Sequence, residues 1–191
     1  MEGFASIRPG NRRETAGAAR RPFLRSRDPY AEGVANEIDW TSRINSLPSG
    51  WVREMGITIT SATTEEVRGE LQVTERHHQG LGIVHGGVYC GVIETLASIG
   101  AAIVASARGQ SVVGLENSTS FVRAVRGGLL RASAAPVTRG RTTQLWEGRI
   151  CDGEDRVVAT GRVRLLCLDA DRPVDGATYR FAPDPEADPE A

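Results

Sequence analysis

Lysine is absent from this chain, and all 23 of its basic residues are arginines. This excludes a phosphate-binding loop of the G-x-x-x-x-G-K-[ST] type, which needs a lysine. Cysteine is scarce as well. Cys90, Cys151 and Cys167 are an odd number, lie far apart and include no C-x-x-C pair, so neither a disulfide framework nor a zinc site is indicated. We therefore expect a reducing, cytoplasmic setting.

A strong net charge and a long apolar run are also missing. The formal net charge is -1, which creates no field that would attract nucleic acid or an anionic membrane. The longest apolar run, at residues 99–107, is far shorter than the roughly 20 residues of a membrane span. Arg20 and Arg21 resemble the start of a twin-arginine signal, but no apolar segment follows them, so export is not expected.

The length and composition predict one folded domain with a tail at each end. A chain of 191 residues with 40% hydrophobic residues can form one core of ordinary size. Residues 1–36 are rich in arginine and show no apolar periodicity, which predicts a disordered tail. Residues 170–191 form an acidic C-terminal tail. The predicted domain is residues 37–169.

Within that domain the pattern alternates between helix and strand. Residues 36–47 suit a short helix that Pro48 ends, and residues 88–106 suit one long helix. Two strands are predicted between these helices, at 56–63 and 65–75. Four β-rich runs follow, at 111–125, 129–140, 142–153 and 155–168, separated by hairpin turns. This order predicts an α+β fold, in which a six-stranded antiparallel sheet wraps around one long central helix.

The candidate chemistry lies at the start of that helix. A helix beginning at Gly86 and Gly87 exposes unpaired backbone N–H groups at the positive end of its dipole, where glycine allows a ligand to come close. Such a site can polarise an acyl carbonyl. Glu94 is the only charge between this turn and Arg108, and a lone carboxylate in an apolar helix indicates an interface or a pocket. We therefore interpret Glu94 as functional.

The neighbouring polar residues allow two readings each. His85 either bonds to a nearby loop or orients the Gly-Gly turn. Ser98, one turn beyond Glu94, either holds water or the reacting centre, or only packs in the helix. His77 and His78 are adjacent and would point to opposite faces of an extended segment, so a metal site is not expected.

The stretch H-Q-G-L-G-I-V-H-G-G-V-Y-C-G-V-I-E-T-L-A-S, residues 78–98, resembles the hot-dog-fold acyl-CoA thioesterases. The subgroup it resembles includes phenylacetate-pathway and 4-hydroxybenzoyl-CoA thioesterases with a catalytic helix glutamate, and the likeness covers about residues 39–168. The resemblance implies hydrolysis of an acyl-CoA to free acid and CoA, with Glu94 as nucleophile or general base and the Gly86 N–H polarising the carbonyl. It places Gln79 near that carbonyl or the carboxylate, and it implies no cofactor beyond the CoA of the substrate.

Coenzyme A is a polyanion that needs basic and hydroxyl partners. Arg binds phosphate through a forked guanidinium, and hydroxyls add donors. The candidates, which the resemblance also favours, are Arg123, Arg141, Thr142 and Thr143. The acyl group stays open between aromatic and aliphatic.

Helix geometry predicts that two subunits share the site. Gly86 and Glu94 are eight residues apart, or roughly 12 Å along one helix axis, which a Glu side chain does not cross. Two antiparallel helices in a two-fold dimer would bring them together, which predicts a homodimer as the catalytic unit and, from the resemblance, a homotetramer. The alternatives are a hot-dog hydratase or dehydratase, which would use an Asp/His pair, and a noncatalytic acyl-CoA-binding protein, which we would expect to lack the helix carboxylate.

Overall fold

The computed structural model describes residues 39–46 and 50–178, so the tail predicted at 1–36 and the final residues of the acidic tail lie outside the described residues. Two short helices come first, then two strands and a 3-10 turn, then one long helix and four strands. In chain order these are α1 (Trp40–Ser46), α2 (Gly50–Met55), β1 (Ile57–Ala62), β2 (Val67–Val73), η1 (Glu75–His77), α3 (Gly86–Ser106), β3 (Gln110–Phe121), β4 (Gly128–Arg139), β5 (Thr143–Cys151) and β6 (Val157–Asp169).

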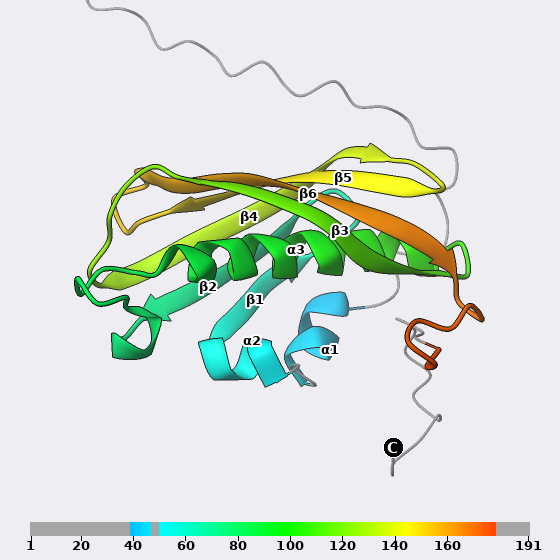
Figure 1. Ribbon diagram of the computed structural model, residues 1–191, viewed down its shortest axis with the longest axis horizontal. Helices are drawn as coiled ribbons and strands as arrows, with labels where there is room; N and C mark the ends of the chain where they lie inside the picture. The colour runs from blue at the N-terminus through cyan, green and yellow to red at the C-terminus, as the bar shows by residue number, and fades with distance from the viewer. Residues whose placement is uncertain (1–38, 47–49, 179–191) are drawn as a thin grey trace, which may run out of the picture.

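The six strands form one antiparallel sheet in the order β1-β2-β4-β5-β6-β3. The sheet curves around α3, while α1 and α2 lie on the side of α3 that faces away from β5 and β6 (Figure 1). Because β3 is paired only with β6 in the described part of the chain, its other edge is unpaired there. The predicted α+β architecture is confirmed.

Small residues on α3 allow the sheet to approach it closely. A Cβ at Gly100 would lie 2.3 Å from the ring of Trp146, which is fully buried on β5. On the sheet side, a Cβ at Gly148 would lie 2.8 Å from Ile93. Gln144 donates from Nε2 to the Ala101 carbonyl at 3.1 Å and so ties β5 to the helix backbone.

By length and composition α3 could span a membrane, but 72% of its most apolar stretch is buried inside the fold.

The hairpin between β5 and β6 is held by one carboxylate. Asp152 accepts hydrogen bonds from the N–H groups of Glu154 and Arg156 at 3.0 and 3.1 Å, and from Arg156 Nε at 2.8 Å. Burial opposes the ionisation of Asp152, but the hydrogen bonds from Arg156 and the backbone outweigh it and lower the pKa of this carboxyl.

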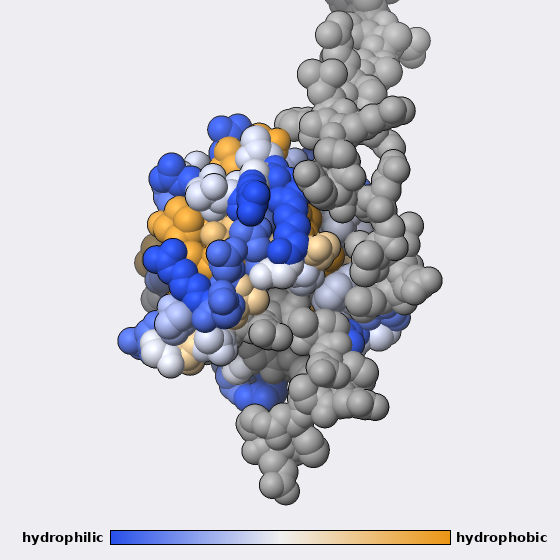
Figure 2. Space-filling view, turned by 90° about the vertical axis from the view of Figure 1, so that its right-hand side faces the viewer, coloured by the Kyte–Doolittle hydropathy of each residue, from blue (hydrophilic) through white to orange (hydrophobic). Residues whose placement is uncertain are grey.

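At the far end of the molecule, where α3 finishes, the surface alternates hydrophilic residues with smaller apolar patches (Figure 2).

The structure adds two elements that the sequence pattern did not predict. The helix α2 and the turn η1 are each too short to show a hydrophobic period. Helix α3 begins at Gly86, at the Gly-Gly pair and two residues before the run predicted at 88–106, with His85 as its N-cap.

Candidate active site

The N-terminus of α3 presents a backbone donor that has no partner among the described residues. His85 is the N-cap, and its Nδ1 accepts a hydrogen bond from the Gly87 N–H at 2.9 Å. The Val88 N–H bonds to the His85 carbonyl at 2.9 Å. No hydrogen bond of the Gly86 N–H occurs within residues 39–46 and 50–178. His85 therefore holds the turn, and the Gly86 N–H remains available to an acceptor from outside.

Gly86 also allows an aromatic ring to lie directly against it. A Cβ at this position would lie 2.4 Å from Cε2 of Phe121, which comes from the end of β3. The Phe121 ring is 57% exposed and lies 6.0 Å, centroid to centroid, from the ring of Tyr89. The turn is thus bordered on one side by an apolar surface, which keeps water away from one flank of the Gly86 N–H.

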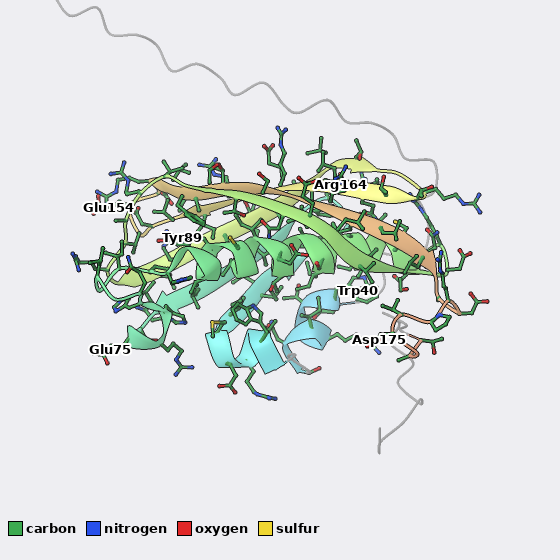
Figure 3. All side chains as sticks on the ribbon, in the orientation of Figure 1. Trp40, Glu75, Tyr89, Glu154, Arg164 and Asp175 are labelled. Atoms are coloured by element: carbon green, nitrogen blue, oxygen red, sulfur yellow. The ribbon has the colours of Figure 1, made fainter. Side chains whose placement is uncertain are left out.

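Tyr89 lies between α3 and the sheet (Figure 3). Its hydroxyl is buried and has no hydrogen-bond partner in the described part of the chain. Burial raises the pKa of Tyr89, since the charged phenolate would be poorly solvated there. An unpaired hydroxyl at this depth destabilises the fold, and nothing in the arrangement gives it a catalytic contact.

Gln79 stabilises the loop before α3 through the oxygen of its side-chain amide. Its Oε1 accepts a hydrogen bond from the Leu81 N–H at 3.0 Å, and its backbone closes the same loop through Gly82 and Ile83. No hydrogen bond from its Nε2 occurs among the residues described. The loop therefore fixes the side chain while leaving the NH₂ group as a donor.

Glu94 is held by a partner on β3 that sequence reasoning missed. Asn117 Nδ2 donates to Glu94 Oε2 at 2.9 Å and to the Cys90 carbonyl at 3.1 Å. Thr119 Oγ1 in turn donates to Asn117 Oδ1 at 2.6 Å, which fixes which end of the amide faces the carboxylate. No sequence signal marks Asn117, because residues 116–120 around it are all polar.

The strand also makes room for this carboxylate. A Cβ at Gly114 would lie 2.6 Å from Glu94 Oε1, so any other residue there would displace the carboxylate. The register of β3 against β6 shifts between Gly114 and Glu116, which is a bulge at the point where the strand passes Glu94. Bulges are common beside active sites, where they direct a side chain or end a pairing.

Glu94 lies on the one incompletely buried stripe of α3. The small or polar residues that share this stripe are Gly87, Cys90, Gly91, Thr95 and Ser98. No hydrogen bond of the Ser98 hydroxyl occurs in the described residues, so its two readings stay open. The sheet covers the opposite side of the helix. Glu94 is therefore open to a ligand along this stripe.

His77 and His78 serve the loop instead of a ligand. The buried His77 accepts from the Thr74 N–H at Nδ1, at 2.9 Å, so its Nε2 carries the proton and donates to the Met55 carbonyl at 2.9 Å. His78 Nε2 bonds to the Arg126 carbonyl at 2.8 Å. Both rings are committed to backbone groups.

The structure does not bring all the predicted residues together within one chain. Gly86 and Glu94 stay on one straight helix, and the roughly 12 Å between them is not closed. Arg123 follows β3 at the end near Phe121, whereas the turn with Arg141 lies at the Gln110 end of the sheet, where Gln110 Nε2 donates to the Arg141 carbonyl at 3.3 Å. The predicted CoA ligands therefore form two groups at opposite ends of β3.

A curved antiparallel sheet around one central helix is the hot-dog fold. Residues 81–159 match the model of the thioesterase superfamily. The Mycobacterium tuberculosis protein Rv1847 is 44% identical over 119 residues, which are 61% of this chain and 85% of that protein. The chain therefore belongs to the thioesterase superfamily.

Other relatives and solved structures agree. The proofreading thioesterase EntH of Cronobacter sakazakii is 37% identical over 117 residues, covering 61% of this chain and 85% of EntH. The 1,4-dihydroxy-2-naphthoyl-CoA hydrolase of Listeria monocytogenes is 34% identical over 116 residues, covering 61% and 94%. The structure of Rv1847 superimposes with a TM-score of 0.62 over 64% of this chain and 98% of that one. Thioesterase HI1161 of Haemophilus influenzae gives 0.64 at 28% identity, over 69% and 92%.

Proposed function

We propose that this protein hydrolyses acyl-CoA thioesters to the free acid and CoA, with Glu94 as the catalytic carboxylate. The observation that carries the proposal is the setting of Glu94, which lies on the open stripe of an otherwise apolar helix and is oriented by Asn117 at 2.9 Å. The names of the relatives support this chemistry, because EntH is a thioesterase and the Listeria protein is an acyl-CoA hydrolase. The likeness to the phenylacetate-pathway and 4-hydroxybenzoyl-CoA subgroup belongs to the same proposal.

Gly86 and Gln79 act on the carbonyl oxygen of the thioester, and Glu94 acts on its carbonyl carbon or on the attacking water. The Gly86 N–H and the Gln79 NH₂ group donate hydrogen bonds to the thioester oxygen and stabilise the negative charge that develops on it. As a general base, Glu94 takes a proton from water, the water oxygen attacks the carbonyl carbon, and the C–S bond breaks to release CoA thiolate, which is then protonated. As a nucleophile, Glu94 attacks that carbon itself, releases the thiolate and forms a mixed anhydride that water then cleaves.

A single turnover in ¹⁸O-labelled water reveals the nucleophilic route if water cleaves the anhydride at the Glu94 carbonyl. General-base catalysis incorporates ¹⁸O into the acid released in the first turnover. If water instead cleaves a mixed anhydride at the Glu94 carbonyl, the first acid is unlabelled and the label appears in the Glu94 peptide. Mass spectrometry of both the acid and the peptide reads out the difference.

Two copies of the chain would complete the site. Among the described residues one edge of β3 is unpaired, and the strand carries the exposed apolar side chains of Leu115 and Phe121, with Val122 directly after it, at 52%, 57% and 59% exposure. An unprotected apolar edge strand favours pairing with a second copy. Antiparallel pairing of β3 with its counterpart would run the two α3 helices in opposite directions, so that Glu94 of one chain faces the Gly86 turn of the other.

The same pairing accounts for the divided CoA ligands. It would bring the Gln110 end of one chain to the Phe121 end of its mate, and with it the turn that holds Arg141, Thr142 and Thr143. Arg123 of the first chain lies at that Phe121 end and is exposed, as are the three residues of the turn. We therefore assign the CoA phosphates to basic groups from both subunits.

The hydratase alternative lacks its second group. The candidate is His85, but its Nδ1 is already occupied by the Gly87 N–H and holds the turn. The noncatalytic alternative leaves the oriented Glu94 without a role. Both are weaker accounts of the site than hydrolysis.

The test is Glu94→Gln, assayed with a panel of aromatic and aliphatic acyl-CoAs and a thiol reagent that detects released CoA. We expect kcat to fall by about 10²–10⁴, the usual contribution of a positioned base, with the melting temperature little changed. Glu147→Gln is the matched control, because Glu147 is on the outer face of β5 and pairs with Arg162. Near-normal turnover in the Glu94 variant would disprove the assignment.

A further inference from the structure

We infer that Trp51 of α2 forms the wall of the acyl pocket and favours a planar acyl group over a saturated chain. This inference rests on the proposed function, and it concerns which acyl group the same site accepts. Trp51 is 46% exposed, an unusual state for so large an apolar side chain at a position that packs on a helix.

The first observation is where the ring lies. A Cβ at Gly91 would lie 2.4 Å from Cζ2 of Trp51 and 3.2 Å from its Nε1, so the edge of the indole rests on the backbone of α3. Gly91 is three residues before Glu94 on the same face of the helix, roughly 4.5 Å along the axis. One edge of the ring is therefore fixed beside the carboxylate, and nearly half of the side-chain surface remains open.

The second observation is the glycine itself. A glycine in a helix interior destabilises it by about 1 kcal/mol relative to alanine, and Gly91 is in the second turn of the 21-residue α3. The close approach of Trp51 is what requires it, because any Cβ there would displace the indole. The chain therefore retains a helix-weakening residue at the position where an aromatic ring must sit low beside Glu94.

The third observation is the shape of the surroundings. On one side of Glu94 lies β3, with Asn117 bonded to both the carboxylate and the Cys90 carbonyl. On the other side lies Trp51 over Gly91. The stripe between them has a floor of small residues, so an acyl group whose carbonyl carbon is near Glu94 extends along this floor and against the indole. Stacked aromatic pairs contribute more than the area they bury, and a saturated chain does not gain this term.

The experiment compares kcat/KM for benzoyl-CoA and hexanoyl-CoA in wild type, Trp51→Phe and Trp51→Leu. Leucine keeps an apolar side chain without a flat face, and phenylalanine keeps the flat face. We expect the benzoyl-to-hexanoyl ratio to fall about 2- to 12-fold in Trp51→Leu and to be largely retained in Trp51→Phe. Arg53→Ala, on the same helix with an exposed side chain, is the matched control and should leave the ratio unchanged.

Binding provides a readout that does not depend on turnover. In the Glu94→Gln background, a non-hydrolysable thioether analogue of benzoyl-CoA should quench tryptophan fluorescence, and the quench should be lost in Glu94→Gln/Trp51→Leu. An unchanged ratio in Trp51→Leu, or a quench that survives the loss of Trp51, overturns the inference. So does a Trp51→Leu protein that elutes as a smaller oligomer with both substrates reduced equally, since Trp51 would then be a packing residue. Full hydrolysis by Glu94→Gln would instead overturn the catalytic role of Glu94 and leave this ratio test standing.

Discussion

Asn117 gives the sharpest single-residue test of how the carboxylate is oriented. Its amide joins Glu94 Oε2 at 2.9 Å to the Cys90 carbonyl at 3.1 Å, and Thr119 fixes the orientation of the amide from behind at 2.6 Å. A hydrogen bond to a charged group contributes about 1.5–3 kcal/mol. If that energy serves to hold the carboxylate in its reactive position, Asn117→Ala should lower kcat by about 10- to 150-fold.

The pattern across variants separates positioning from folding. Thr119→Val leaves the Asn117 amide in place but removes its support, so we expect a smaller loss of kcat with KM little changed. Asn117→Asp removes the donor and places a like charge beside Glu94, so it should be less active than Asn117→Ala. The assay is steady-state release of CoA, with the melting temperature measured for each variant.

Asn45 is the matched control for this series. Its amide also makes two hydrogen bonds, to the Ile59 carbonyl at 2.7 Å and from the Ile59 N–H at 3.1 Å, but it joins α1 to β1 away from the site. Asn45→Ala should lower the melting temperature and leave kcat unchanged. If Asn117→Ala behaved in the same way, the reasoning about Glu94 orientation would be refuted.

Three further predictions concern stability. Tyr89→Phe removes a buried hydroxyl with no partner among the described residues, so it should stabilise the protein by about 1 kcal/mol and raise Tm by about 2–4 °C; a lower Tm would reveal a bond to this hydroxyl. The pKa of Asp152 is lowered in the fold, so the ionised carboxylate stabilises the protein at neutral pH, and this stabilisation is lost as the pH falls. Asp152→Asn should therefore lower Tm at pH 7. Thermal scans across pH should show the Tm difference from wild type narrowing only below the ordinary aspartate pKa of about 3.9. Deleting residues 1–35 and 170–191 should change Tm and turnover little, and a large loss of either would mean that a tail packs on the core or on a partner chain.

The large features of the fold could be predicted from sequence because each has a local cause. The long run without proline indicated α3, and short polar turns between β-rich runs indicated the last four strands. Small residues on α3 are also visible in the sequence, and Gly100 is where Trp146 of the sheet comes closest to the helix. Helix α2 was missed because six residues carry too little periodic signal, and its position depends on Trp51 meeting Gly91 across 40 positions of sequence.

The residues of the candidate site also differ in whether the sequence alone could reveal them. Glu94 stands out in sequence because a charge in an apolar helix violates a local rule, and such violations concentrate at functional positions. Asn117 follows no such rule, since a polar residue on an edge strand is ordinary, and only the register of β3 beside α3 reveals its bond to Glu94. The side-chain oxygen of Gln79 bonds within its own loop, while its NH₂ group stays a donor. This arrangement likewise depends on a loop conformation that composition does not encode.

The most direct test of the shared site is subunit mixing. Glu94→Ala and Gln79→Ala, each nearly inactive alone, are unfolded and refolded together, and heterodimers are verified by differential tagging and native mass spectrometry. If Glu94 of one chain serves the helix N-terminus of its mate, half of the dimers will be mixed and each will hold one intact site, so activity should recover to about one quarter of wild type. No recovery in verified heterodimers would mean that each chain carries a complete site, and it would contradict the shared active site proposed for this protein.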